Sequence, residues 1–148
     1  EIEKFFRQRY YPVVKDWLST TPGVVETLQR CAEFDRAHYG QSAITEEPDR
    51  YVMRKDPCGS GGRLRRTRSV GTTKKAYPWS WSKSGVPYYC THCCVFWELV
   101  PIELRGYPIR ISIPGDKPED PCINYFYKKP ELIPEEFFTQ IGKTKKIK

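Results

Sequence analysis

The sequence predicts a single α+β domain, with N-terminal helices packed on a small antiparallel sheet of hairpins and a cysteine-rich metal site. Three observations predict it. Apolar residues recur at helical spacing up to about residue 38, short strand-like segments follow from about residue 43, and three of the six cysteines fall within residues 90–94. A length of 148 residues fits one domain, which we place at residues 1–142, followed by a basic flexible tail at 143–148.

The N-terminal third has the periodicity of helices. Residues 1–10 carry aromatic side chains near helical spacing, and Pro12 allows a new helix to start. A further restart is expected at Thr21 and Pro22, because threonine caps helices and proline suits the first helical position. This last helix would end at Gly40.

A first hairpin is expected next. Residues 51–54 are a short strand candidate, residues 56–62 form a tight glycine-rich turn, and residues 63–68 would return as the second strand. Residues 70–87, rich in Ser, Lys, Gly and Trp, are interpreted as a loop with aromatic anchors.

Two further helices are expected in the second half. Residues 94–104 have one apolar side, and Pro101 must kink or restart the helix that they form. A final short helix should begin within residues 133–138.

A second hairpin lies between these helices. Residues 107–113 alternate, with isoleucines on one face and Arg110 and Ser112 on the other, which predicts a half-buried strand. Residues 123–127 would return beside it.

The cysteine spacing favours metal ligation over disulfides. Cysteines that are adjacent or nearly so rarely pair with each other, because disulfide geometry disfavours it. A cluster with scattered single cysteines is typical of metal ligands in a reducing compartment, and a secreted disulfide protein is the alternative. The six are Cys31, Cys58, Cys90, Cys93, Cys94 and Cys122.

The expected ligand set is Cys58, Cys90, Cys93 and Cys122. Cys90 and Cys93 have the spacing that lets two thiolates reach one ion, and they would open a helix whose N-terminus favours thiolates. Cys58 and Cys122 each end an Asp-Pro-Cys turn beside a strand, and two such turns could reach one metal. The expected cofactor is zinc, with iron conceivable.

The remaining cysteines and the histidine near them are less clear. Cys94 or His92 could substitute in the ligand set, whereas Cys31 is expected to be a buried core residue. Glu98 lies one turn after Cys94 and could act as a base or hold a metal ligand in place. Cys94 could instead be a nucleophile. The catalytic candidates are therefore Glu98, His92 and Cys94.

Two groups of residues could bind a ligand near the metal. Consecutive glycines expose backbone N–H groups to an anion, although a flexible hairpin turn is the alternative. Aromatic side chains can line a small-molecule pocket, stack on bases, or simply pack beneath the loop. The candidates are Gly59, Ser60, Arg63, Trp79, Trp81 and Trp97.

The basic charge suggests a second kind of partner. The net charge is +7, concentrated in residues 63–75 and 143–148. Such stretches suit nucleic acid, although a solvated loop and a frayed tail are the plainer interpretation. No apolar run approaches the roughly 20 residues of a membrane span, and we expect a cytoplasmic protein without a membrane partner.

Residues 90–131 resemble the 4-vinyl reductase small-molecule-binding domain family, and the thiazoline-carboxylate hydrolase-like proteins look similar in layout. The shared pattern is a cysteine opening a helix at Cys90 or Cys93, then Gly106-Tyr107-Pro108-Ile109, then a hairpin from Cys122 to Glu131 that ends Tyr-Lys-Lys-Pro-Glu. The resemblance implies a helix-and-sheet domain with a structural zinc beside a buried ligand pocket. The family's sensor members bring further ligands in the closing hairpin, where this chain has Cys122 alone.

Two functions remain in competition. The first is a zinc-binding domain with a small-molecule pocket beside the metal, acting as a hydrolase-like enzyme or as a ligand sensor. The second is a zinc-stabilised nucleic-acid-binding module that uses the basic residues 63–75.

Overall fold

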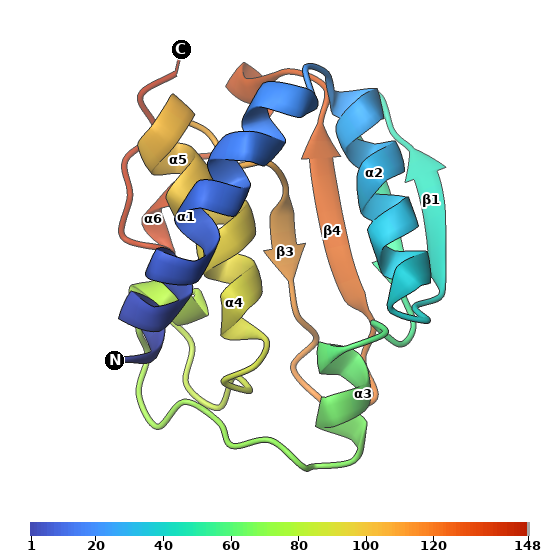
Figure 1. Ribbon diagram of the computed structural model, residues 1–148, viewed down its shortest axis with the longest axis vertical. Coiled ribbons are helices and arrows are strands. Elements are labelled where there is room, and N and C mark those ends of the chain that lie inside the picture. The colour runs from blue at the N-terminus through green and yellow to red at the C-terminus, as the bar shows by residue number, and fades with distance from the viewer. Residues whose placement is uncertain (148) are drawn as a thin grey trace.

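The computed structural model describes residues 1–147 and shows an α+β fold, with helices on a four-stranded antiparallel sheet (Figure 1). The helices are α1 (Ile2–Thr20), α2 (Val24–Ala37), α3 (Gly61–Arg66), α4 (Thr91–Cys94), α5 (Val100–Arg105) and α6 (Glu136–Thr139). A π-helical turn at Val95–Leu99 joins α4 to α5, and short 3-10 turns occur at Pro78–Ser80 and Pro130–Leu132. The strands are β1 (Ser42–Glu46), β2 (Arg50–Lys55), β3 (Ile111–Ile113) and β4 (Cys122–Tyr127).

The sheet has the order β1-β2-β4-β3. Its register places Lys55 of β2 directly opposite Cys122 of β4, and Asn124 between Met53 and Ser112. Since alternate residues of a strand point to the same face, this register gathers one lysine, one cysteine and two further polar side chains on one face of the sheet.

The first predicted hairpin was partly wrong. Residues 63–68 do not form a strand: Gly61–Arg66 is helix α3, and β1 pairs with β2 instead. Residues 63–66 are three arginines and a leucine, which favour helix, whereas Ile44 and Thr45 of β1 favour a strand. The second hairpin is confirmed as the antiparallel pair β3–β4.

The N-terminal helices are confirmed, with different bounds. One helix, α1, runs through Pro12, so the expected restart there does not occur. Gly23 rather than Thr21 is the N-cap of α2, and Thr21 donates its hydroxyl proton to the carbonyl of Trp17 instead. The helix expected over 94–104 is part of one continuous helical segment made of α4, the π-helical turn and α5. Its geometry changes from π-helical to α-helical just before Pro101.

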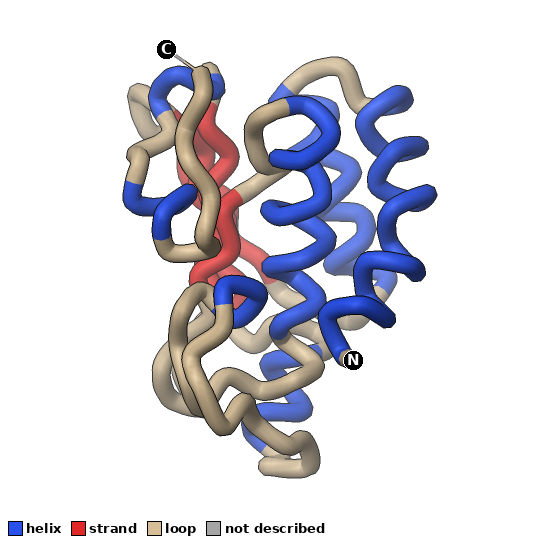
Figure 2. Tube along the Cα trace, turned by 90° about the vertical axis from the view of Figure 1, so that its left-hand side faces the viewer, coloured by secondary structure: helices blue, strands red, loops and turns tan. Residues whose placement is uncertain are grey.

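The sheet is covered on both faces (Figure 2). The helices α1, α2 and α4–α5 bury one face around Val14, Met53 and Phe126. The C-terminal segment covers part of the other around Ile111, Ile133 and Phe138. The strand predicted at 107–113 is confirmed over Ile111–Ile113 alone. Its predicted half-burial was wrong, because Arg110 and Ser112 are buried as well.

No helix among residues 1–147 has the length and apolar character needed to cross a bilayer.

Candidate metal centre

The four predicted cysteine ligands come together around one small pocket. Cys58 follows β2, Cys90 is the N-cap of α4, Cys93 lies within α4, and Cys122 begins β4. All four line a cavity of about 30 Å³, together with Ser60 and Trp81. A space of this size suits one water molecule or one ion.

Two glycines of α3 let the backbone approach these cysteines. A Cβ atom on Gly61 would lie 2.8 Å from Sγ of Cys90, and one on Gly62 would lie 3.1 Å from Cβ of Cys58. Any larger side chain at Gly61 would displace the Cys90 thiol. The glycine-rich segment thus serves the close packing of α3 on the thiols.

The thiols are near one another without being in coordination geometry. Among residues 1–147, no group of three or more Cys, His, Asp or Glu side chains is arranged to hold a metal ion as it stands. Binding an ion would require the four side chains to draw in around it. The donor set itself, four cysteine sulfurs, is one that structural zinc sites use.

Three buried cations surround the thiols. Lys55 is 2 %, Arg65 6 % and Arg110 5 % exposed. The Lys55 ammonium lies 3.5 Å from the Asp35 carboxylate, and Arg65 donates to the backbone carbonyls of Gly115 and Lys117. No carboxylate of residues 1–147 lies within ion-pair distance of Arg110, whose Nε has no hydrogen-bond partner there.

Cys93 and His92 interact directly. Sγ of Cys93 is 3.6 Å from Nε2 of His92, and Nδ1 of His92 hydrogen-bonds to the carbonyl of Tyr89. Burial alone would raise the pKa of Cys93, but the His92 cation outweighs it and lowers that pKa to about 6. Burial works to lower the pKa of His92, and the Cys93 thiolate raises it to about 8. The pair therefore favours a thiolate beside an imidazolium.

The other three thiols respond to the balance between burial and the cations. Burial raises the pKa of Cys90, with the neighbouring Cys93 adding to the rise. Burial likewise raises the pKa of Cys122 to about 11, although the nearby Lys55 cation acts to lower it. At Cys58 burial is again the largest influence, but Lys55 and backbone N–H groups outweigh it and the pKa is lowered.

Glu98 lies in the π-helical turn and is fully buried. Its Oε1 accepts hydrogen bonds from Nε1 of Trp81 and from the backbone N–H of Ser112, both at 2.9 Å. Burial raises the pKa of Glu98 to about 8, despite these two hydrogen bonds. Such π-helical turns occur frequently at functional sites.

Of the remaining catalytic candidates, His92 lines the thiol pocket and Cys94 does not. The Cys94 thiol is buried and donates to the carbonyl of Pro78 at 3.6 Å. Cys31 lies on α2 and is buried in the hydrophobic core, as the sequence predicted.

The predicted ligand-binding residues are divided. Ser60 and Trp81 line the thiol pocket, whereas Gly59 packs against the backbone of His38. Arg63 donates to the carbonyl of Tyr39. Trp79 stacks on Tyr77, and Trp97 is buried beneath the guanidinium of Arg110.

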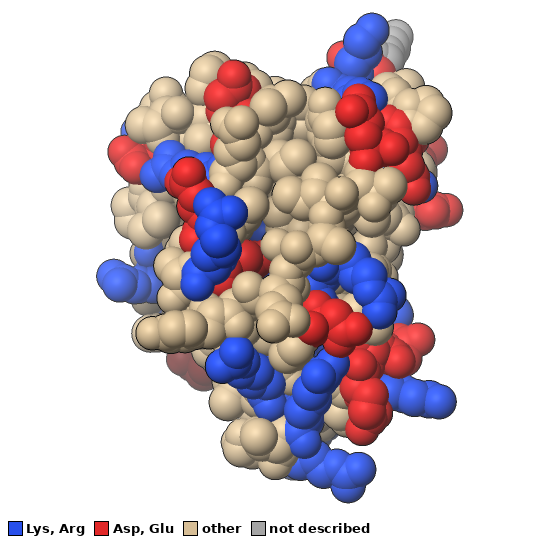
Figure 3. Space-filling view, turned by 90° about the vertical axis from the view of Figure 1, so that its right-hand side faces the viewer, with Lys and Arg blue, Asp and Glu red and all other residues tan. Residues whose placement is uncertain are grey.

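Half of the cations in the basic stretch make contacts within the structure. Beyond the contacts of Arg63 and Arg65, Arg66 pairs with Asp56 at 2.6 Å. Exposed cations without such contacts are Arg68, Lys74 and Lys75. On the face that carries α2, β1 and α3, positive and negative side chains are intermixed (Figure 3).

The predicted flexible tail makes contacts with the domain. Lys143 pairs with Glu103 at 2.7 Å, and Lys145 donates to the carbonyl of Glu131. Lys148 lies outside the described residues.

The buried polar side chains behind the thiols were missed by sequence reasoning. Lys55, Arg65 and Asn124 had no local signal that set them apart from surface residues. Arg110 and Ser112 did show one, since they share the face of β3 opposite the isoleucines, but nothing in the alternation indicated that helices cover that face.

No protein-family model, no curated protein and no solved structure matches this chain. The resemblance of residues 90–131 to the 4-vinyl reductase family is therefore untested and stays a hypothesis.

Proposed function

We propose that this chain is a zinc-binding domain in which Cys58, Cys90, Cys93 and Cys122 hold one metal ion beside a small-molecule pocket. The supporting observation is the charge balance of the interior. Three buried cations face one buried ion-paired carboxylate, Asp35, which leaves an excess of two positive charges. Four thiolates on a divalent ion carry an excess of two negative charges, so the bound centre would neutralise the interior.

Burial of unpaired charge is costly, and this cost argues for ionised thiols at the site. Arg110 is the clearest case, because the groups that favour its charge are three thiols, Cys31, Cys93 and Cys122, and one carboxylate, Asp35, which is already paired with Lys55. Thiolates held by a metal would supply the missing negative charge. Iron has the same preference for thiolates, so the ion's identity is decided by measurement.

The four-thiol set favours a structural ion over a hydrolytic one. Catalytic zinc keeps one position open for water, whereas four protein ligands close the coordination sphere. A ligand-binding or sensing role therefore fits the site better than hydrolysis at the metal. His92 would then hold the Cys93 thiolate rather than the ion.

Elemental analysis of the chain purified under reducing conditions tests the proposal. We expect about one zinc ion per chain, and much lower content in Ser variants of the four cysteines. The variants Cys31→Ala and Cys94→Ala are matched controls, since both remove a buried thiol outside the pocket.

Two results would contradict the proposal. One is wild-type protein that lacks metal and unfolds identically with and without a chelator. The other is metal content that falls equally in the control variants. Iron in place of zinc would change the ion and leave the site intact.

A further inference from the structure

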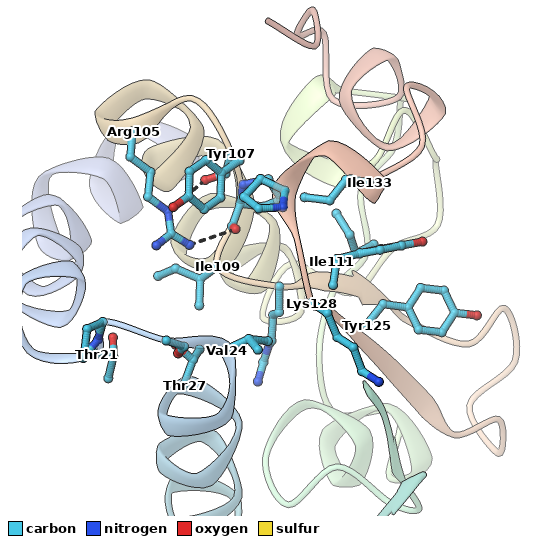
Figure 4. A pocket seen from close by; sticks show the side chains of 16 residues that line it. Thr21, Val24, Thr27, Arg105, Tyr107, Ile109, Ile111, Tyr125, Lys128 and Ile133 are labelled. Atoms are coloured by element: carbon cyan, nitrogen blue, oxygen red, sulfur yellow. Dashed lines mark hydrogen bonds between the residues drawn. The ribbon is translucent and has the colours of Figure 1, made fainter. Parts of the chain in front are cut away.

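A second cavity, of about 200 Å³, lies apart from the thiols. It is enclosed by the loop and first turn leading into α2, by residues that link α5 to β3, and by the end of β4 and the residues after it (Figure 4). The thiol pocket is about 30 Å³. The second cavity is therefore the larger of the two, and its volume limits a ligand to a compact molecule.

The lining of this cavity is one-sided in charge. Its sixteen residues include Arg105, Arg110 and Lys128 and no Asp or Glu. The Lys128 ammonium is already paired with Glu46 at 2.6 Å. Within residues 1–147, no carboxylate lies within ion-pair distance of Arg105 or Arg110. The proposed thiolate centre would neutralise Arg110, so Arg105 is the guanidinium of this lining that lacks a counterion.

Arg105 is held in a fixed orientation at the cavity. Its Nε donates to the carbonyl of Tyr107 at 3.2 Å, and its Nη2 donates to that of Pro108 at 3.0 Å. The guanidinium also lies 4.0 Å from the centroid of the Tyr107 ring. Figure 4 shows the two side chains next to each other. A guanidinium has five N–H donors, so several remain for a ligand.

Arg110 has an unmet hydrogen bond. It is 5 % exposed, it lies 4.0 Å over the ring of Trp97, and its Nε has no partner within residues 1–147. A buried charged donor without an acceptor is unfavourable by more than a typical hydrogen bond contributes. The lining therefore calls for an acceptor that carries negative charge.

The rest of the lining mixes apolar and aromatic side chains with the hydroxyl groups of two threonines. Val24, Ile109 and Ile133 supply aliphatic surface, and Tyr125 and Tyr127 supply rings with hydroxyl groups. The Glu26 carboxylate folds back against Gly23 near this site, but it is not part of the lining. Walls that are partly apolar and carry a guanidinium group without a counterion suit a molecule with an apolar part and one anionic end.

We infer that this cavity binds a small organic carboxylate with an apolar part, whose carboxylate is neutralised by Arg105 and accepts a hydrogen bond from Arg110. The inference deepens the small-molecule part of the proposed function and does not depend on the metal. It also moves the ligand site away from the glycine-rich and tryptophan residues that the sequence favoured.

Binding of benzoate and 2-naphthoate, measured by titration calorimetry against their matched amides, tests the inference. We expect at least one of the carboxylates to bind wild-type protein. Its amide should bind with an affinity lower by about tenfold or more, because the amide lacks the charge-assisted hydrogen bonds. Arg105→Gln and Arg110→Gln should each weaken carboxylate binding about tenfold or more. Arg54→Gln, which removes an exposed charge on β2, should leave it unchanged.

A cavity-narrowing variant keeps the test independent of charge and of folding defects in the arginine variants. Val24→Phe should abolish binding of the larger carboxylate while all cations remain. Metal content is measured on every sample, so loss of metal is distinguished from loss of the ligand. Equal binding of carboxylates and amides, no carboxylate binding at millimolar concentration, or affinity unaffected by Val24→Phe and Arg105→Gln would each overturn the inference.

Discussion

The indole of Trp81 and the carboxyl group of Glu98 are joined by a buried hydrogen bond of 2.9 Å, donated by Nε1 of the tryptophan. The bond ties the aromatic loop to the π-helical turn. Trp81 has a left-handed backbone, with φ of +53°, which is unfavourable for a bulky residue and needs such support. The same oxygen of Glu98 accepts from Ser112, so one side chain connects the loop, the helix and β3.

Removing the Glu98 carboxyl group should destabilise the domain. Glu98→Ala leaves two buried donors without an acceptor and opens a cavity, which we expect to cost about 2–4 kcal/mol. Glu98→Gln keeps the accepting oxygen and should cost about 1 kcal/mol or less at neutral pH. Denaturant unfolding measures both, and equal losses would show that the hydrogen bonds do not matter.

The raised pKa of Glu98 predicts a pH dependence of stability. Its folded value of about 8 exceeds the unfolded value of 4.5, so the folded state holds the proton more tightly. Stability from this group is fully present below about pH 4.5 and is lost as the pH rises through about 8. The difference in unfolding free energy between the wild type and Glu98→Gln should therefore shift against the wild type over this window. A difference that stays constant with pH would show that Glu98 has an ordinary pKa.

Much of this arrangement was readable from the sequence, and the reason is local. The spacing of Cys90 and Cys93 and the two Asp-Pro-Cys turns indicated four cysteines that the fold does bring to one pocket. The strand expected at 63–68 failed, because helix propensity and packing against the thiols decide that segment. Lys55 and Arg110 could not be foreseen, since their burial depends on helices far away in the sequence.

Gly61 should be required for the thiol pocket. In Gly61→Ala, the new methyl group would lie 2.8 Å from Sγ of Cys90, so either the thiol or α3 must move. We expect weaker zinc binding in competition with a chromophoric chelator. Gly71→Ala is the control, because its methyl group would make an ordinary contact of 3.5 Å with Tyr88. The same zinc affinity in both variants would argue against close packing at Cys90.

Lys55 should stabilise both the fold and the thiolates. Lys55→Met leaves Asp35 as a buried unpaired charge, which typically costs about 3–5 kcal/mol, and it raises the pKa of Cys58 by removing a nearby cation. Zinc affinity should fall with it. Adding Asp35→Asn should restore much of the stability but not the zinc affinity. If the double variant recovered the zinc affinity as well as the stability, Lys55 would act only by pairing with Asp35 and not by stabilising the thiolates.

The nucleic-acid alternative makes a separate prediction. Arg68, Lys74 and Lys75 are the exposed cations of the basic stretch, whereas Arg65 is buried and its substitution would disturb folding. We expect no micromolar binding to single- or double-stranded oligonucleotides by fluorescence anisotropy at about 0.1 M salt. Tight binding that weakens steeply with salt, and that disappears when all three are changed to Glu, would favour this alternative.

X-ray absorption spectroscopy of the metal-loaded protein tests the four-thiolate centre most directly. The account predicts four sulfur neighbours at about 2.3 Å from a zinc ion, with no nearer nitrogen or oxygen ligand. A first shell dominated by nitrogen or oxygen, or one unchanged when Cys58 and Cys122 are replaced by Ser, would contradict it.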